Sequence, residues 1–223
     1  MQTPAERDLV QRLVSLLNAN GDARKECRIL NAGAGKSLSI ERQISKQGCS
    51  YLCDRIDVED CSVDFPMVGE CWCCSIEDMS QLDSQRYDIV FANYVLEHVE
   101  KIQDAAREIF RVLVPGGVFI STISNPSAPE FAMARKTPLW FHKLIRRQDS
   151  WETQYAYNSV EELLSVFHSI GLKVEEENRW PIVEGYLHKY PVLGPIGRFY
   201  DRMVSKSGNR RLMGDVCFVL RRG

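Results

Sequence analysis

The sequence predicts an α/β fold built on one mostly parallel sheet, and three observations support this. Short apolar runs typical of buried strands alternate with segments whose apolar residues recur at helical spacing. A length of 223 residues, 44% of them hydrophobic, suffices for one substantial core, so we expect a single domain over residues 1–223. Strands joined through helices form right-handed crossovers, which places ligand sites at the carboxyl ends of parallel strands.

The chain opens with a helix predicted within residues 1–26. Thr3 and Glu6 have the spacing of a capping box, and Pro4 stands at the first helical position. Leucines then recur at helical spacing as far as Gly21. Residues 27–123 follow as the expected core of the sheet, with strands at Arg28–Ala32, Ser50–Cys53, Glu70–Ser75, Tyr87–Ala92 and Val118–Ile123, and helices near Lys36–Lys46 and Ile102–Leu113.

Residues 124–157 break this alternation, and we interpret them as an inserted lid over a substrate. In the remaining segment, 158–223, Ser159 and Glu162 form a second capping box, whose helix should stop at Gly171. The last two of seven strands are expected at Leu172–Glu177 and Asp215–Leu220, with a second insertion at 181–213 between them.

Charge and composition limit the classes of function. The net charge of −2 argues against a dedicated nucleic-acid-binding protein. Residues 1–120 carry 13 Lys and Arg against 19 Asp and Glu (−6), and residues 121–223 carry 15 against 11 (+4). A basic second half suits an acidic substrate or a membrane surface, although solvated surface charge gives the same pattern. Without a leader-like segment or a run of ~20 apolar residues, we expect a cytoplasmic protein with no stable membrane insertion. The sequence leaves the oligomeric state open.

The eight cysteines are expected to be reduced and mostly buried, because a chain with a core of this size needs no disulfides. Cys49 and Cys53 begin an iron–sulfur spacing, but Ile56 stands where its third cysteine would be. The cysteines at 71, 73 and 74 have no neighbouring histidine. We therefore expect no metal site.

A glycine loop, Asn31-Ala32-Gly33-Ala34-Gly35-Lys36-Ser37, follows the first predicted strand. Such a turn exposes backbone amides to an anionic or nucleotide ligand. A phosphate-binding P-loop would need a glycine at Leu30, and a dinucleotide loop would need its third glycine at Leu38. An S-adenosylmethionine (SAM) loop needs only the short glycine turn. From the loop alone, the choice among these ligands stays open.

More specific motifs follow downstream. Asp88, Leu96-Glu97-His98, Arg111-Val112-Leu113 and Pro115-Gly116-Gly117 occur in a characteristic order and spacing. With the glycine loop, they make residues 27–123 resemble the SAM-binding core of class I SAM-dependent methyltransferases, most closely the branch with quinone-pathway and natural-product enzymes. The resemblance implies a Rossmann-like seven-stranded sheet with helices on both faces, SAM as cofactor, S-adenosylhomocysteine as product, and no metal.

The resemblance also implies the cofactor contacts. The amides of Gly33 to Gly35 and the helix start beyond them suit the methionine carboxylate. An acid at the end of the second strand suits the ribose diol; Asp54 is the first choice, with Asp57 as the alternative. The full set of cofactor residues expected is Asn31, Ala32, Gly33, Gly35, Asp54, Ser75, Ile76, Glu77, Asn93 and Tyr94.

The expected reaction is methyl transfer to an oxygen or nitrogen, or to a carbon, of a small biosynthetic intermediate. His98 is the candidate base for an acceptor that must lose a proton, whereas Glu97 is expected to fold back on backbone amides. His142, Tyr155 and Tyr157 are weaker candidates for substrate contact. The alternatives are a protein or RNA methyltransferase, or a SAM-binding protein without catalysis.

Overall fold

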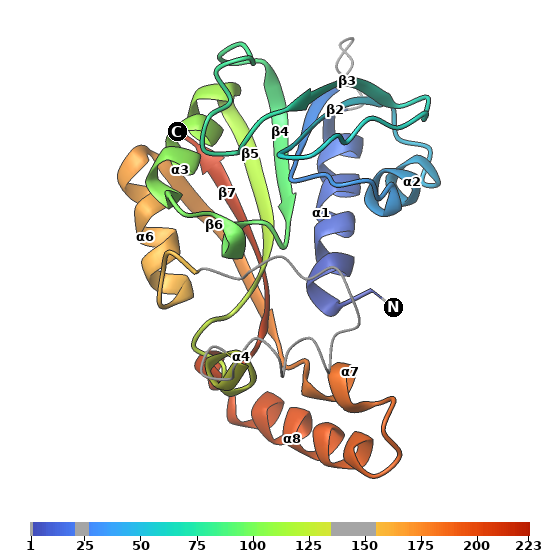
Figure 1. The fold of residues 1–223 in the computed structure, drawn as a ribbon, viewed down its shortest axis with the longest axis vertical. Helices are drawn as coiled ribbons and strands as arrows, with labels where there is room; N and C mark the ends of the chain where they lie inside the picture. Colours follow the sequence, from blue (N-terminus) through green and yellow to red (C-terminus); the bar gives the residue numbers. More distant parts are fainter. Residues whose placement is uncertain (1, 21–26, 135–154) are drawn as a thin grey trace.

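A seven-stranded sheet forms the centre of the computed structural model, which describes residues 2–20, 27–134 and 155–223 (Figure 1). The strand order is β3-β2-β1-β4-β5-β7-β6. Strands β1 to β5 pair in parallel, and β7 runs antiparallel to both β5 and β6. This confirms the predicted mostly parallel sheet. The strands are β1 (Cys27–Ala32), β2 (Tyr51–Asp57), β3 (Val68–Cys73), β4 (Tyr87–Asn93), β5 (Leu113–Ser124), β6 (Leu172–Trp180) and β7 (Asp215–Arg222).

Helices cover both faces of the sheet (Figure 1). On one face, α1 (Pro4–Asn20) and α2 (Ser39–Ser45) bury their apolar side chains against β1, β4 and β5. On the other face, α3 (Ile102–Val112) and α6 (Val160–Ile170) enclose the larger of two main cores. The apolar spacing of each helix puts its buried residues on the side that meets the sheet.

The helix ends follow the predicted local signals. The hydroxyl of Thr3 accepts from the Glu6 amide at 3.1 Å, and the Glu6 carboxylate accepts from the Thr3 amide at 3.0 Å, which completes a capping box. At α6, the Ser159 hydroxyl accepts from the Glu162 amide at 3.1 Å. Gly171 then ends that helix in the left-handed conformation, with φ of 106°.

Some element boundaries differ from those predicted. Strand β2 continues to Asp57 instead of ending at Cys53, because the charged residues after Cys53 are buried and paired. Helix α2 begins only at Ser39 instead of near Lys36, and β5 begins at Leu113 instead of Val118. None of the described helices is long and apolar enough to cross a membrane.

Several short helices lie beyond the carboxyl ends of the parallel strands (Figure 1). Helix α4 (Pro129–Ala134) follows β5, and α7 (Val183–Leu187), α8 (Leu193–Ser207) and the 3-10 helix η2 (Arg210–Leu212) lie between β6 and β7. Most of the expected lid, residues 135–154, lies outside the described part of the chain.

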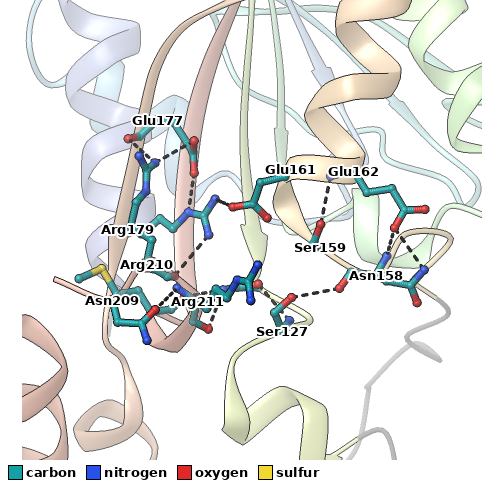
Figure 2. A network of polar contacts seen from close by, with 12 residues as sticks. Ser127, Asn158, Ser159, Glu161, Glu162, Glu177, Arg179, Asn209, Arg210 and Arg211 are labelled. Atoms are coloured by element: carbon teal, nitrogen blue, oxygen red, sulfur yellow. Dashed lines mark hydrogen bonds and ion pairs between the residues drawn. The ribbon is translucent and has the colours of Figure 1, made fainter. Parts of the chain in front are cut away.

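A polar network fixes the base of this group of helices to the sheet (Figure 2). The side chain of Arg179 on β6 is 2% exposed and contacts Glu161 on α6 at 2.6 Å and Glu177 at 2.5 Å. Glu177 also pairs with Arg210 of η2 at 2.8 Å. Because a buried guanidinium needs such partners, the network holds η2, β6 and the start of α6 in one arrangement.

Candidate active site

The glycine turn lies where β1 ends. Gly33 and Gly35 have φ of 77° and 54°, in the left-handed region that favours glycine. A Cβ atom on Gly33 would lie 2.3 Å from a methyl group of Val95, whereas no atom lies within 4 Å of a Cβ on Gly35. Gly33 is therefore required for the close approach of the segment after β4, and the space beside Gly35 is open to a ligand.

The amides of this turn are already hydrogen-bonded. Those of Gly33 and Ala34 donate to the carbonyl of Ile56 at 2.9 and 3.0 Å, and that of Gly35 donates to Oδ2 of Asp57 at 2.8 Å. In this structure the three amides therefore have acceptors within the protein, and their contact with a carboxylate stays a prediction. The partial positive charge at the start of helix α2 is also not placed at the glycines, because this seven-residue helix begins only at Ser39.

Buried Arg55 holds the turn from behind. Its Nη2 donates to three backbone carbonyls of the turn at 3.0–3.1 Å, and its Nη1 donates to Oε1 of Glu41 at 2.8 Å. Both side chains are fully buried. The same Oε1 accepts from Nδ2 of Asn31 at 2.8 Å. The side chain of Asn31, expected at the cofactor, thus belongs to the support of the turn.

The two acids of β2 have different positions. Asp54 lies within the strand, opposite Leu30, and is 2% exposed. Its carboxylate accepts from the Tyr87 hydroxyl and Arg86, both at 3.0 Å, and from the Glu70 amide at 2.9 Å. The placement of Asp54 at a strand end is therefore wrong, because three hydrogen bonds keep it inside the sheet.

Asp57, the alternative, ends β2 beside the glycine turn. Its Oδ2 accepts from the Gly35 amide and its Oδ1 from the Glu59 amide at 3.1 Å. A carboxylate offers about four acceptor positions. Asp57 therefore keeps capacity for further hydrogen bonds at the carboxyl edge of the sheet.

The three residues expected at the adenine follow β3. Ile76 is buried in the larger core, and the Ser75 hydroxyl accepts from the Glu77 amide at 3.1 Å. The carboxylate of Glu77 accepts from the amides of Glu100 and Lys101, at 2.7 and 2.9 Å, just before α3. The Glu77 side chain is thus engaged at the helix start.

Asn93 and Tyr94 end β4, and they contact the start of α1. Nδ2 of Asn93 donates to Glu6 at 3.0 Å, and its Oδ1 accepts from Thr122 at 2.6 Å. The Tyr94 hydroxyl contacts Thr3 at 2.5 Å and donates a short hydrogen bond to Asp215. Burial, followed by the charge of Asp215, raises the pKa of Tyr94. The phenol therefore stays neutral, and this network places the helix start against the carboxyl edge of the sheet.

Glu97 is the buried acid of this edge. It lies in the 3-10 helix η1 (Leu96–His98) and is 4% exposed. Burial is the main cause that raises the pKa of Glu97 to about 7. Its Oε1 accepts a long hydrogen bond of 3.4 Å from the Ser124 amide. Its Oε2 has no hydrogen-bond partner among the described residues. The expectation that Glu97 folds back on amides holds for one oxygen only.

Tyr157 and Tyr155 accompany this acid. The Tyr157 hydroxyl is buried and finds no partner within the described chain, and its pKa is raised by burial and by the charge of Glu97. The Tyr155 amide donates to the Glu97 carbonyl at 3.1 Å, and the two tyrosine rings meet edge to face, 5.8 Å apart. The structure thus brings two of the three expected substrate residues to Glu97. The third, His142, lies outside the described residues.

His98 lies next to Glu97 on η1 and is half-buried. Sequence reasoning chose this histidine because its ordinary pKa suits a base, and so passed over the carboxylate beside it. The sequence signal for Glu97 was its position directly after the apolar pair Val95-Leu96, just beyond the fourth strand. Within the described ranges, no group of three or more His, Cys, Asp or Glu side chains could hold a metal ion.

Comparison with known proteins agrees with this arrangement. Residues 30–121 match the family described as "Methyltransferase domain". The malonyl-(acyl-carrier protein) O-methyltransferase of Enterobacter lignolyticus is 29% identical over 129 residues, which are 57% of this chain and 51% of that protein. The chain thus spans about half the length of this relative.

Solved structures share the fold over nearly the whole chain. Geranyl diphosphate C-methyltransferase from Streptomyces coelicolor A3(2) has a TM-score of 0.63 at 13% identity, with 97% of this chain and 80% of that chain covered. The cyclase SpnF has a TM-score of 0.59 at 19% identity, with 95% and 80% covered. At such identities these two proteins show the fold alone. Strand order and motifs agree with the matched segment, and over residues 30–121 the chain is similar to the class I SAM-dependent methyltransferases.

Proposed function

We propose that this protein transfers the methyl group of SAM to an oxygen or nitrogen atom, or to a carbon atom, of a small-molecule acceptor. The observation that carries the proposal is that an open glycine turn, Asp57 and the buried Glu97 all lie at one edge of the sheet. The small molecule in the name of one structurally similar protein, geranyl diphosphate, supports an acceptor of low mass.

The residues at the ends of β1 and β2 fit the donor. The open side of Gly35 leaves room for its methionine part, Asp57 has acceptor capacity for the ribose hydroxyls, and Ile76 offers an apolar side to the adenine. Bound SAM supplies a methyl group on a sulfonium, which is itself a good leaving group. The protein's main tasks are then to orient the acceptor and exclude water, and good orientation contributes up to about 7–11 kcal/mol.

An acceptor O–H or N–H must also lose its proton. Glu97 is our proposed proton acceptor, in place of His98, because Oε2 is buried at the strand ends and has spare acceptor capacity. The neighbouring Tyr157 hydroxyl is positioned to orient the same acceptor. A base with a pKa near the working pH is effective in general-base catalysis, where its contribution is typically about 10²–10⁴-fold.

Calorimetry with SAM and with S-adenosylhomocysteine tests the donor site. Asp57→Ala should weaken both affinities at least tenfold. The substitution removes hydrogen bonds to a charged carboxylate, and each such bond contributes about 1.5–3 kcal/mol. The matched control is Asp83→Ala, whose side chain is 89% exposed, and its affinity should equal that of the wild type. Equal affinity of Asp57→Ala and the wild type would contradict the assignment.

Turnover is tested with a panel of hydroxy, amino and carboxy metabolites, by formation of S-adenosylhomocysteine. Glu97→Gln should lower kcat by at least 100-fold on an acceptor that loses a proton, and His98→Asn by less than tenfold. A larger loss of kcat in His98→Asn than in Glu97→Gln would indicate that His98 is the base. Donor binding without product formation on any acceptor would indicate a SAM-binding protein without catalysis, and methylation of protein or RNA alone would replace the small acceptor.

A further inference from the structure

Helix α8 presents an apolar strip to solvent. Val192 just before the helix is 77% exposed, and Ile196, Phe199 and Met203 are 57%, 72% and 49% exposed. At 3.6 residues per turn, these four positions fall within about 60° of one another around the helix axis. They therefore form one continuous strip, which we call the α8 strip.

The α8 strip does not serve the protein's own core. The inner side of α8 is a different face, on which Gly194, Gly197 and Val204 are buried. A Cβ atom on Gly197 would lie 2.9 Å from Cα of Glu184, so this side packs tightly on α7. Figure 1 shows α8 at the end of the molecule, and no other described element lies on its outer side. Exposure of four large apolar side chains together favours a binding surface.

Cations border the α8 strip on one side. Arg198, Arg202 and Lys206 are exposed and lie along the next stripe of the same helix. The single acid of α8, Asp201, faces inward, where it accepts from the amides of Val183 and Glu184 at 3.1 and 2.8 Å. Arg198 pairs with Glu184 of α7 at 2.7 Å, so Arg202 and Lys206 are the cations of this stripe without an ion pair among the described residues.

We propose that the α8 strip docks on the surface of a membrane that contains anionic lipids. An amphipathic helix with large apolar residues beside arginine and lysine is suited to the boundary of acyl chains and anionic headgroups. Charge argues against a second copy as the occupant. A second copy would offer no acid from the outward side of its own α8 to pair with Arg202 and Lys206 across a two-fold contact. This inference does not rest on the proposed function.

Sedimentation with vesicles tests the inference. The full chain should bind vesicles of equal parts phosphatidylcholine and phosphatidylglycerol, and bind phosphatidylcholine vesicles at least tenfold less. Ile196→Ser with Phe199→Ser should reduce partitioning into the anionic vesicles at least tenfold. Arg202→Gln with Lys206→Gln should reduce it about fivefold for each charge, since a basic residue near such a surface contributes about 1 kcal/mol.

The controls are matched exposed residues elsewhere. Val174→Ser replaces an apolar residue of β6 that is 43% exposed, and Arg107→Gln removes a cation of α3 whose side chain is 61% exposed. Both should bind as the wild type does. Failure of the wild type to bind anionic vesicles would overturn the inference, as would equal losses in α8 and control variants. A dimer in light scattering that dissociates in Ile196→Ser with Phe199→Ser would assign the strip to a second copy instead.

Discussion

Glu97→Gln should stabilise the fold above neutral pH. The pKa of Glu97 is about 7 in the folded protein because the charged carboxylate is buried, and the ordinary value is 4.5. A difference of this size corresponds to about 3 kcal/mol between the two protonation states. Glutamine keeps the shape of the protonated acid without the charge, so the variant avoids the cost of a buried anion.

The sign of the pH dependence follows from linkage. Between the unfolded and folded pKa values, the folded protein holds a proton that the unfolded chain has released. The contribution of Glu97 to the free energy of unfolding therefore falls as pH rises from about 4.5 to 7, and is constant above that. Urea unfolding at pH 5 and pH 8 measures this. The variant's free energy of unfolding minus that of the wild type should be about 3 kcal/mol larger at pH 8 than at pH 5.

Activity should change in the opposite direction. The wild-type rate on a protonated acceptor should rise with pH to a plateau above about pH 7, and Glu97→Gln should lose both the rate and this dependence. Glu59→Gln, at an exposed acid, is the control for both assays. Parallel pH dependence of stability in Glu97→Gln and the wild type would refute the reasoning, because a group that titrates normally cannot give this difference.

Two further predictions concern the support of the glycine turn. Arg55→Met should cost about 3–5 kcal/mol in urea unfolding because it leaves Glu41 buried and unpaired, and adding Glu41→Gln should recover much of that loss; no recovery would contradict a coupled pair. Gly33→Ala should cost about 1–3 kcal/mol more than Gly35→Ala, since only its Cβ overlaps Val95, and Val95→Ala should remove most of the difference. Equal losses in the two glycine variants would argue against close packing at residue 33.

The sequence predicted the sheet well because each strand carries a local signal. The predicted strands overlap all seven observed strands, although β6 is mostly polar, and the capping boxes at Thr3 and Ser159 gave the starts of α1 and α6. The end of β2 was misplaced because Asp54 and Arg55 look like the polar end of a strand. Their burial depends on Arg86 and Glu41, partners 32 and 14 residues away, which local periodicity cannot reveal.

The same limit applies to the site. The sequence placed Gly33, Asn93 and Tyr94 at the carboxyl edge, and the structure brings them there. It could not tell which polar groups at this edge already have partners. Tyr94 is engaged by Thr3, near the start of the chain, and by Asp215, the first residue of the last strand. Such contacts arise only when the sheet assembles.

Position in the fold, together with hydrogen-bond partners, therefore separates support from binding, because Oε2 of Glu41 also lacks a partner among the described residues but lies behind the turn. Asp54 and Arg55 of β2 and Glu41 of α2 are buried, and their hydrogen bonds fix the backbone on which the turn depends. Asp57 and Glu97 lie at the edge and have oxygens with capacity to spare. A buried polar atom without a partner costs about 1–3 kcal/mol. A fold that retains one at Glu97, at the carboxyl ends of parallel strands, gains a group that a polar acceptor satisfies on binding.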